Sequence, residues 1–353
     1  MAVNNTRFRL CFIAMGLTLL AIVLSGITVA PADITLRDTA SALLAGISRL
    51  LDRIDGLPVT EAVSWQDTII WQVRLPRVLV AVFVGAALAT SGAVLQGLFR
   101  NPLASSDTLG VSSGASLGGV LAIYLGLTTT TIWALPILAF IGATLSLLLV
   151  YSIASERGQA PVATLLLAGI AVGSLNVAAS SLVQALALEK WEVGKSIVYW
   201  NMGGLDRRTW HHVALIAPLL TIGLLVTLAH CRELDILLAG ETQAAAVGVN
   251  ITKTRLILLA MVSLLIAGSV SVAGGVGFVG LVVPHIVRLA TGPHHRHLIP
   301  LSALGGALML AGADWVLRVG WDGNDIPVGI FTAAMGAPFF LWLLYRGRRQ
   351  LFL

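Results

Sequence analysis

The chain has 353 residues, of which 57% are hydrophobic and only 11% are charged, and its formal net charge is +5. An ordinary soluble domain carries about 25% charged residues, so this composition excludes a soluble enzyme or soluble binding module. The modest positive charge does not indicate a nucleic-acid partner, because basic residues in a membrane protein mostly set its orientation. We therefore expect an all-α polytopic membrane protein embedded in the lipid bilayer.

Ten apolar segments are candidates for membrane-spanning helices. A spanning helix needs about 20 apolar residues, whereas strands of a membrane barrel have about 9–11 residues of alternating polarity. The apolar runs here are long and do not alternate. The predicted spans are 10–31, 76–98, 109–127, 132–153, 162–187, 211–230, 256–274, 276–291, 299–317 and 326–345. They form a single transmembrane domain over residues 1–353, in which only the glycine cluster at 274–280 separates the seventh span from the eighth.

The first span has the basic flank and apolar run of a signal peptide, but the run exceeds the 7–15 residues typical of one. We interpret it as a retained helix. An even number of spans places the two basic ends, NNTRFR and YRGRRQ, on one side, which basic residues mark as cytoplasmic. The long polar segment 32–75 is then periplasmic and carries a short amphipathic helix on the membrane surface. The largest cytoplasmic loop, 231–255, is too small to be an ATPase.

Several short motifs suggest chemistry that their context does not support. Residues 275–280 read GVGFVG, a dinucleotide-binding pattern, yet no acidic residue follows at about 20 positions. We interpret this stretch as a break between packed helices. Residues 194–196 read GKS, but Glu189 stands where a phosphate-binding loop needs its first glycine. No catalytic residue and no cofactor is expected, and ATP-driven transport requires the ATPase to be another chain.

The cysteine and histidine residues do not predict a disulfide framework or a metal site. Cys11 and Cys231 both lie near span ends on the predicted cytoplasmic side, where disulfides are rare. His294, His295 and His297 occur in the loop sequence GPHHRH, whose adjacent histidines lack the i, i+4 spacing of a helical zinc site. We expect a solvated or headgroup-facing loop there.

Charged residues gather near two span ends on the predicted periplasmic side. Arg74 and Arg77 flank Pro76 at the mouth of the second span, and Arg318 lies on the same predicted face at the end of the ninth. They are either interfacial anchors or guanidinium groups that meet carboxylates of a partner. Asp314 precedes Arg318 by four residues, which predicts an ion pair within one helix.

Residues 237–249, LLAGETQAAAVGV, predict a short helix of small residues between the sixth and seventh spans. It either docks into a shallow groove of another protein or simply connects the spans. An ion-driven secondary transporter is the alternative function, but such proteins hold ionisable residues at mid-membrane, and the spans here have almost none.

Taken together, these stretches resemble the FecCD, or vitamin B12-type, permease family, the membrane subunits of type II ABC importers. The resemblance runs in family order across nearly the whole chain. It rests on RLPRVLVAVFVGAALATSGAVLQGLFRNPLASSDTLGVSSGASLG (74–118), YWNMGG (199–204), LLAGETQAAAVGVN (237–250), VGFVGLVVPHIVRLATGPHHRHLIPLSALGGA (276–307) and AD…R…DIPVGIFTAAMGAPFFLWLL (313–344). Two departures are Asp325, where the family commonly has Glu, and the charged loop GGLDRRTWHH.

The resemblance implies a ten-helix permease of the bacterial inner membrane with both termini in the cytoplasm. Two such subunits, identical or different, form the pathway together with two ATPase subunits and a periplasmic binding protein. The implied cargo is an iron chelate, a ferric siderophore or haem, with vitamin B12 or molybdate as the alternative. The implied site residues are Arg74, Arg77 and Arg318 for docking of the binding protein, Gly240, Glu241, Ala245 and Gly248 for ATPase coupling in 231–255, and Gly169, Ser174, Ala178 and Ala334 for the pathway wall.

Overall fold

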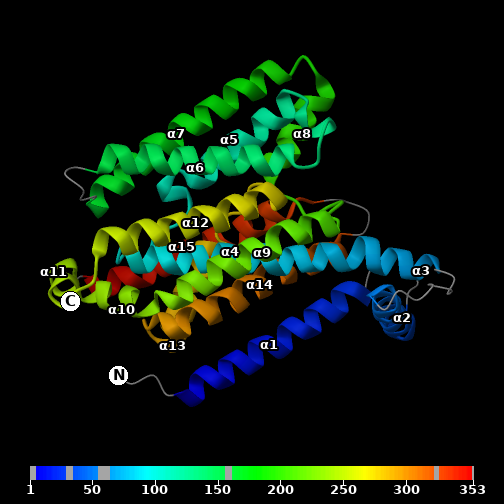
Figure 1. The fold of residues 1–353 in the computed structure, drawn as a ribbon, viewed down its shortest axis with the longest axis horizontal. Coiled ribbons are helices and arrows are strands. Elements are labelled where there is room, and N and C mark those ends of the chain that lie inside the picture. The colour runs from blue at the N-terminus through cyan, green and yellow to red at the C-terminus, as the bar shows by residue number, and fades with distance from the viewer. Residues whose placement is uncertain (1–4, 29–34, 55–63, 156–160, 322–325, 352–353) are drawn as a thin grey trace.

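The computed structural model describes residues 5–28, 35–54, 64–155, 161–321 and 326–351. Position 325, one of the two departures from the family pattern, lies outside these residues. The regular structure of the described residues is helical (Figure 1). Its ten apolar helices are α1 (Asn5–Thr28), α4 (Leu75–Leu98), α5 (Val111–Tyr124), α6 (Ala134–Ala154), α7 (Val162–Ala187), α9 (Trp210–Ala229), α12 (Ile251–Ala273), α13 (Val279–Thr291), α14 (His295–Gly320) and α15 (Val328–Leu351).

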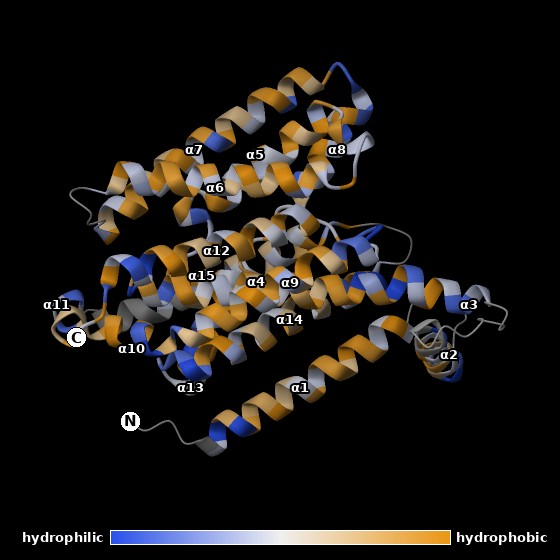
Figure 2. Cartoon of the chain, in the orientation of Figure 1, coloured by the Kyte–Doolittle hydropathy of each residue, from blue (hydrophilic) through white to orange (hydrophobic). Residues whose placement is uncertain are grey.

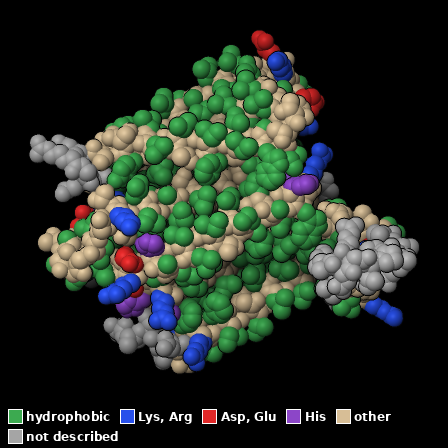
Figure 3. Space-filling model, in the orientation of Figure 1, with side chains coloured by type: hydrophobic (Ala, Val, Ile, Leu, Met, Phe, Trp, Pro, Cys, Tyr) green, Lys and Arg blue, Asp and Glu red, His purple; other side chains and the backbone are tan. Residues whose placement is uncertain are grey.

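The prediction of an all-α membrane protein with about ten apolar helices is confirmed. Seven of the described helices are long and apolar enough to cross a membrane, and three shorter ones are apolar over 10–17 residues. Hydrophobic residues cover the middle of the bundle, whereas polar residues concentrate at its two ends (Figures 2 and 3). Helix α1 begins and α15 ends at the same end of the bundle, on the left in Figure 1.

Two of the predicted spans are shorter in the structure. The third, predicted over 109–127, is α5 with 14 residues, and the eighth, predicted over 276–291, is α13 with 13 residues. At 1.5 Å per residue each is about 20 Å long, less than the hydrocarbon thickness of about 30 Å. Both begin after an irregular segment with a left-handed glycine, Gly110 or Gly274. Irregular backbone is tolerated at membrane depth where surrounding protein buries it.

Helix α4 is the centre of the bundle, and α9, α12, α13 and α14 pack around it. From Val84 to Leu98 every residue of α4 is buried. Close approach depends on paired glycines: a Cβ on Gly85 would overlap the backbone of Gly306 in α14, and a Cβ on Gly92 would overlap that of Gly280 in α13. Helices α5, α6 and α7 form a second layer, which α12 joins to the first (Figure 1).

The arginine–proline motif lies at the start of α4, where the second span was predicted to begin, and Pro76 occupies one of the first helical positions. Helix α3 (Trp65–Thr68) leads through a π-helical turn, Ile69–Arg74, directly into α4. In the π-helical turn Leu75 donates its backbone N–H to the carbonyl of Ile70. Pro76 has no N–H to donate, and it lies in the first turn of α4, where this absence is tolerated. The predicted amphipathic helix between the first two spans is present as α2 (Leu36–Ile54).

Helix α8 (Trp191–Met202) was not among the predicted elements, and residues 194–196 lie within it. Its end meets the glycine break between α12 and α13. Gly204 donates to the carbonyl of Ala273 at 2.8 Å, and Gly329, at the start of α15, donates to that of Gly203 at 3.2 Å. The interpretation of 275–280 as a break between helices is confirmed, because residues 274–278 are non-helical.

Candidate functional site

Two polar sites occupy opposite ends of the bundle. The first, here called the arginine cluster, consists of Arg74, Arg77, Arg207, Arg208, Arg318, Asp206 and Asp314. Its centre is Arg77 on α4, which joins two other elements. The Nε and Nη2 atoms of Arg77 donate to Asp314 Oδ1 on α14 at 3.0 and 2.8 Å. Its Nη1 lies 2.6 Å from Oδ1 of Asp206, in the loop between α8 and α9.

The predicted ion pair within α14 is confirmed. Arg318 Nε lies 3.0 Å from Asp314 Oδ2, so Asp314 is shared by two arginines. The Asp314 side chain is only 2% exposed, whereas that of Asp206 is 32% exposed. Asp314 is therefore the inner carboxylate of the cluster, and Asp206 is the outer one.

The other two predicted docking arginines hold the end of α1. Arg74 is buried, and its Nη1 donates to the carbonyls of Ile27 and Thr28 at 2.8 and 2.9 Å. Arg318 Nη1 donates to the carbonyl of Gly26 at 2.8 Å. The last carbonyls of a helix lack partners within the helix and carry partial negative charge. These arginines therefore fasten α1 to α4 and α14.

The structure brings Arg74, Arg77 and Arg318 together, although 244 positions separate the first from the last. Sequence reasoning missed the contribution of the α8–α9 loop, whose charged residues were noted only as a departure from the family pattern. Arg207 is exposed there, and desolvation lowers the pKa of Arg208 to about 10, although Asp206 partly offsets that effect. Five arginines and two aspartates leave the cluster positively charged at neutral pH.

The second site, here called the coupling segment after the role predicted for it, consists of residues 231–250 at the opposite end. It contains two short helices, α10 (Cys231–Ala239) and α11 (Glu241–Ala246), where one short helix over 237–249 was predicted. Gly240 joins them at φ +126°, and Gly248 follows α11 at φ +84°, both in the region that favours glycine. Ala245 and Gly248 are exposed, and Val247 is 66% exposed. An apolar face thus projects from this end.

Glu241 forms an ion pair between the coupling segment and α12. Its Oε1 lies 2.7 Å from Nη2 of Arg255, on the first turns of α12. The Arg255 side chain is 7% exposed and that of Glu241 is 46% exposed. The glutamate therefore holds α11 against α12 while one side remains accessible.

The interpretation of the histidine loop as solvated or headgroup-facing is wrong for His295. Its side chain is completely buried, because it lies at the start of α14 against α4 and α10. His295 donates from its backbone nitrogen and from Nδ1 to Oδ1 of Asp235, at 2.8 and 2.7 Å. Burial raises the pKa of Asp235, but the hydrogen bonds and charge of the histidines outweigh it and hold that pKa below its usual value. His294 remains exposed.

The predicted pathway residues do not all face outward. Ser174 and Ala178 lie on the exposed side of α7, and Ala334 is exposed on α15. Gly169 is instead buried in a helix contact, where a Cβ would overlap the carbonyl of Thr108. Helix α7 packs against α5, α6 and α8, whereas α15 packs against α8, α13 and α14.

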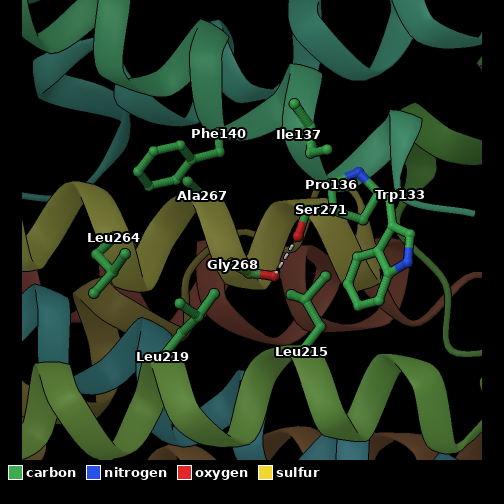
Figure 4. A pocket seen from close by; sticks show the side chains of 10 residues that line it. All are labelled: Trp133, Pro136, Ile137, Phe140, Leu215, Leu219, Leu264, Ala267, Gly268 and Ser271. Atoms are coloured by element: carbon green, nitrogen blue, oxygen red, sulfur yellow. Dashed lines mark hydrogen bonds between the residues drawn. The ribbon is translucent and has the colours of Figure 1, made fainter.

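Two hollows in the surface are apolar and hold no charged side chain. One, of about 280 Å³, lies between α6, α9 and α12 (Figure 4). The hydroxyl of Ser271 in its wall already donates to the carbonyl of Gly268 at 2.8 Å. The other, of about 600 Å³, lies between α1, α13, α14 and α15 and includes Cys11. Cys11 and Cys231 are both free thiols. These linings offer no group to hold an anionic chelate.

Comparison with known proteins gives a consistent result. A family model, the FecCD transport family, matches residues 17–346. The cobalamin import system permease protein BtuC of Halobacterium salinarum is 41% identical over 355 residues, covering 94% of each chain. The Fe(3+) dicitrate transport system permease protein FecD of Escherichia coli is 40% identical over 280 residues, covering 79% of this chain and 86% of the relative.

The fold also matches a solved structure. An inward-facing conformation of an ABC transporter described as metal-chelate type superposes with a TM-score of 0.80. It is 29% identical in sequence, and the match covers 95% of this chain and 98% of that one.

Proposed function

The chain belongs to the FecCD transport family and is a permease subunit of an ABC importer, and we propose that its cargo is an iron chelate, either a ferric siderophore or haem. The observation that carries this proposal is the 40% identity to a permease for ferric dicitrate, supported by the match to a metal-chelate type transporter. Such a subunit works with ATPase subunits, a substrate-binding protein and a second permease subunit. We place the assembly in the bacterial inner membrane, with two permease and two ATPase chains.

Cobalamin is the second candidate cargo, and a specific observation favours it. The cobalamin permease is matched over 94% of both chains, a longer match than that to the ferric dicitrate permease. Both cargos are metal ions enclosed in an organic ligand, so the same wide, weakly binding pathway suits either one.

Uptake into vesicles tests the cargo directly. The complex with its ATPase and binding protein is reconstituted, and uptake of ⁵⁵Fe-labelled ferric dicitrate, ⁵⁵Fe-labelled haemin and ⁵⁷Co-labelled cobalamin is followed with ATP inside. We expect ATP-dependent uptake of an iron compound. Uptake of cobalamin alone would overturn the iron assignment. Uptake that persists without ATP and follows an ion gradient would instead support the secondary-transporter alternative.

For docking, we propose that Arg77 and Arg318 receive acidic residues of the binding protein, with Arg74 as their support. The net positive charge of the arginine cluster supports this role, since complementary charge steers association. Arg77 is 21% exposed at its side chain and Arg318 is 13% exposed, so both reach the surface. Arg74 is buried against the carbonyls of α1, and it acts by positioning these two groups.

The salt dependence of a charge-reversal variant tests the docking role. We expect Arg77→Glu to weaken binding-protein affinity, with the larger loss at low salt because exposed charges are screened at high salt. Arg37→Glu, an exposed arginine on α2 near the same end, is the matched control and should change affinity little. Equal affinity of Arg77→Glu and wild type at low salt would contradict the docking role.

For ATPase coupling, we propose that Gly240, Glu241, Ala245 and Gly248 present the coupling segment to the ATPase. The exposed small residues of α11 and the turn at Gly248 support this role. A Cβ on Gly248 would meet open space, so a substitution there acts through its φ of +84°. Asn tolerates positive φ better than Val, and we expect Gly248→Val to uncouple hydrolysis from transport more than Gly248→Asn. Equal coupling in both variants would contradict the assignment.

For the pathway, we propose that Ser174 and Ala178 of α7 and Ala334 of α15 form its wall together with a second subunit. All three residues are exposed and have small side chains. This supports the role, because a large chelate slides past such a surface without tight binding. Gly169 serves the wall indirectly by letting α7 approach the segment before α5.

A further inference from the structure

The two candidate sites share two helices. Helix α14 carries Asp314 and Arg318 of the arginine cluster near its last residue and His295 at its first. Helix α4 carries Arg77 near its start and Gly97 near its end. From His295 to Asp314 is about 28 Å along the axis at 1.5 Å per residue. One helix pair therefore extends from the binding-protein side of the molecule to the coupling segment.

These helices are held together at three levels. At one end Arg77 bridges to Asp314 at 2.8 Å. In the middle the backbones of Gly85 and Gly306 are in direct contact, since a Cβ on either would overlap the other's carbonyl. At the other end the His295 ring packs against Gly97 so closely that a Cβ there would overlap its Nε2. Packed interiors of this density transmit displacement and do not absorb it.

The coupling segment joins this helix pair through Asp235. One carboxylate oxygen accepts both the backbone N–H and the Nδ1–H of His295, so α10 holds the first residue of α14 at two points. A carboxylate is favourable there, because the first N–H groups of a helix lack partners and carry partial positive charge. Helix α10 also packs against α4 and α14, and two of its leucines, Leu234 and Leu237, are buried.

We propose that Asp235 and His295 are positioning residues that transmit movement of the coupling segment to the α4–α14 pair, and through it to the arginine cluster. The ATPase moves α10 and α11, the Asp235–His295 bond carries α14 along, and the contact of His295 with Gly97 carries α4. Docking at the arginine cluster acts in the reverse direction, since coupling between two sites is reciprocal. This inference rests on the proposed coupling and docking roles of the two ends.

Four variants test whether the Asp235–His295 hydrogen bond transmits movement or only stabilises the fold. Asp235→Ala removes the acceptor, whereas Asp235→Asn keeps an amide oxygen that accepts from His295. Gly97→Ala leaves Asp235 intact and displaces the His295 ring. Asp38→Ala is the matched control, because Asp38 is also a carboxylate that accepts a backbone N–H at a helix start, that of Thr35 before α2, far from the coupling segment.

The test uses the whole complex in vesicles with ATP inside and the three labelled compounds named above. The readouts are the amount of ATPase subunit retained on purification, the stimulation of ATP hydrolysis by the binding protein, and the compound transported per ATP hydrolysed. In Asp235→Ala and in Gly97→Ala we expect the ATPase to be retained while stimulation and transport per ATP fall about fivefold or more, the lower range of typical coupling. Asp235→Asn should keep most of the stimulation and most of the transport per ATP. Asp38→Ala should keep the wild-type values of both.

Wild-type stimulation and transport per ATP in Asp235→Ala would overturn the proposal. So would a loss in Asp235→Asn as large as that in Asp235→Ala, because the hydrogen bond would then not be the link. If Asp235→Ala does not assemble, Gly97→Ala decides: retained ATPase with normal stimulation overturns the proposal. A wild-type complex that transports none of the three compounds refutes the cargo assignment alone, since stimulation by the binding protein still reports the link.

Discussion

Replacing Asp314 by Asn tests whether the arginine cluster is a buried ion network. The carboxylate is 2% exposed and is shared by Arg77, at 2.8 Å, and Arg318, at 3.0 Å. Asn is almost the same size, so packing changes little, but the negative charge between two cations is lost. The two guanidinium groups then face each other in a poorly solvated site.

The expected cost follows from the partners that remain. Removing one member of a buried ion pair typically costs about 3–5 kcal/mol, because it leaves an uncompensated charge. Here Arg77 keeps Asp206 at 2.6 Å, and Arg318 keeps the carbonyl of Gly26 at 2.8 Å. We therefore expect Asp314→Asn to lower the free energy of unfolding by about 3 kcal/mol, the low end of that range. Reversible unfolding of the purified subunit in mixed SDS micelles measures it.

A double-mutant cycle identifies the cause. If the cost arises from uncompensated charge, removing Arg318 as well should relieve part of it. We expect Asp314→Asn/Arg318→Gln to be less destabilised than the sum of the single variants by at least about 1 kcal/mol, within the range seen for residues in contact. Additive costs would refute the ion-network explanation. Asp206→Asn, on the exposed side of Arg77, is the control and should cost less than about 1 kcal/mol.

Three further perturbations test the packing and the polar contacts. Gly306→Ala places a Cβ on the backbone of α4 and should destabilise by about 1–3 kcal/mol in the same SDS assay, whereas Gly16→Ala, which meets nothing within 4 Å, should cost nothing. Asn176 is buried and donates to α6 at 2.8 Å, so Asn176→Ala should lower the free energy of unfolding by about 1–3 kcal/mol. Asp235 has a lowered pKa in the folded protein, so its stabilisation is complete above its unfolded pKa of about 3.9 and is lost as pH falls through the lower folded pKa. Acid unfolding should therefore show wild type more stable than Asp235→Asn near neutral pH, with the difference closing below pH about 3.9; a constant difference at every pH would contradict this.

The features that the sequence predicted well depend on residues that are close together along the chain. Long apolar runs have a direct physical cause in the thickness of the bilayer, and they predicted the ten apolar helices. The ion pair between Asp314 and Arg318 was also predictable, because four positions make one helical turn. Gly114 and Gly118 also lie one helical turn apart, and a Cβ on either would overlap the backbone of α6.

What the sequence did not predict depends on contacts between distant segments. Arg77 and Asp314 are 237 positions apart, and no spacing rule joins them. His295 was misinterpreted for the same reason. Its neighbours in the loop are polar and one of them, His294, is exposed, but the aspartate that makes burial of the ring favourable comes from α10, 60 positions earlier. A buried polar group needs its partner, and that partner is visible only in three dimensions.

The docking role proposed for the arginine cluster is compatible with its contribution to stability, because its two carboxylates differ in exposure. Asp314 lies at the inner side of Arg77 and holds α4 against α14, and its bonds are desolvated and costly to break. Asp206 lies at the outer side, 32% exposed in a loop, where an ion pair with solvent access contributes little stability. In the proposed docking, an acidic residue of the binding protein would replace Asp206 at Nη1 of Arg77 while Nε and Nη2 stay bonded to Asp314. Such docking would keep α4 bonded to α14 and would act on the α8–α9 loop, whose Gly204 donates to the end of α12. The proposed exchange of one outer carboxylate for another would thus take place where α4, α12 and α14 begin or end, and it would require no rupture of the buried network.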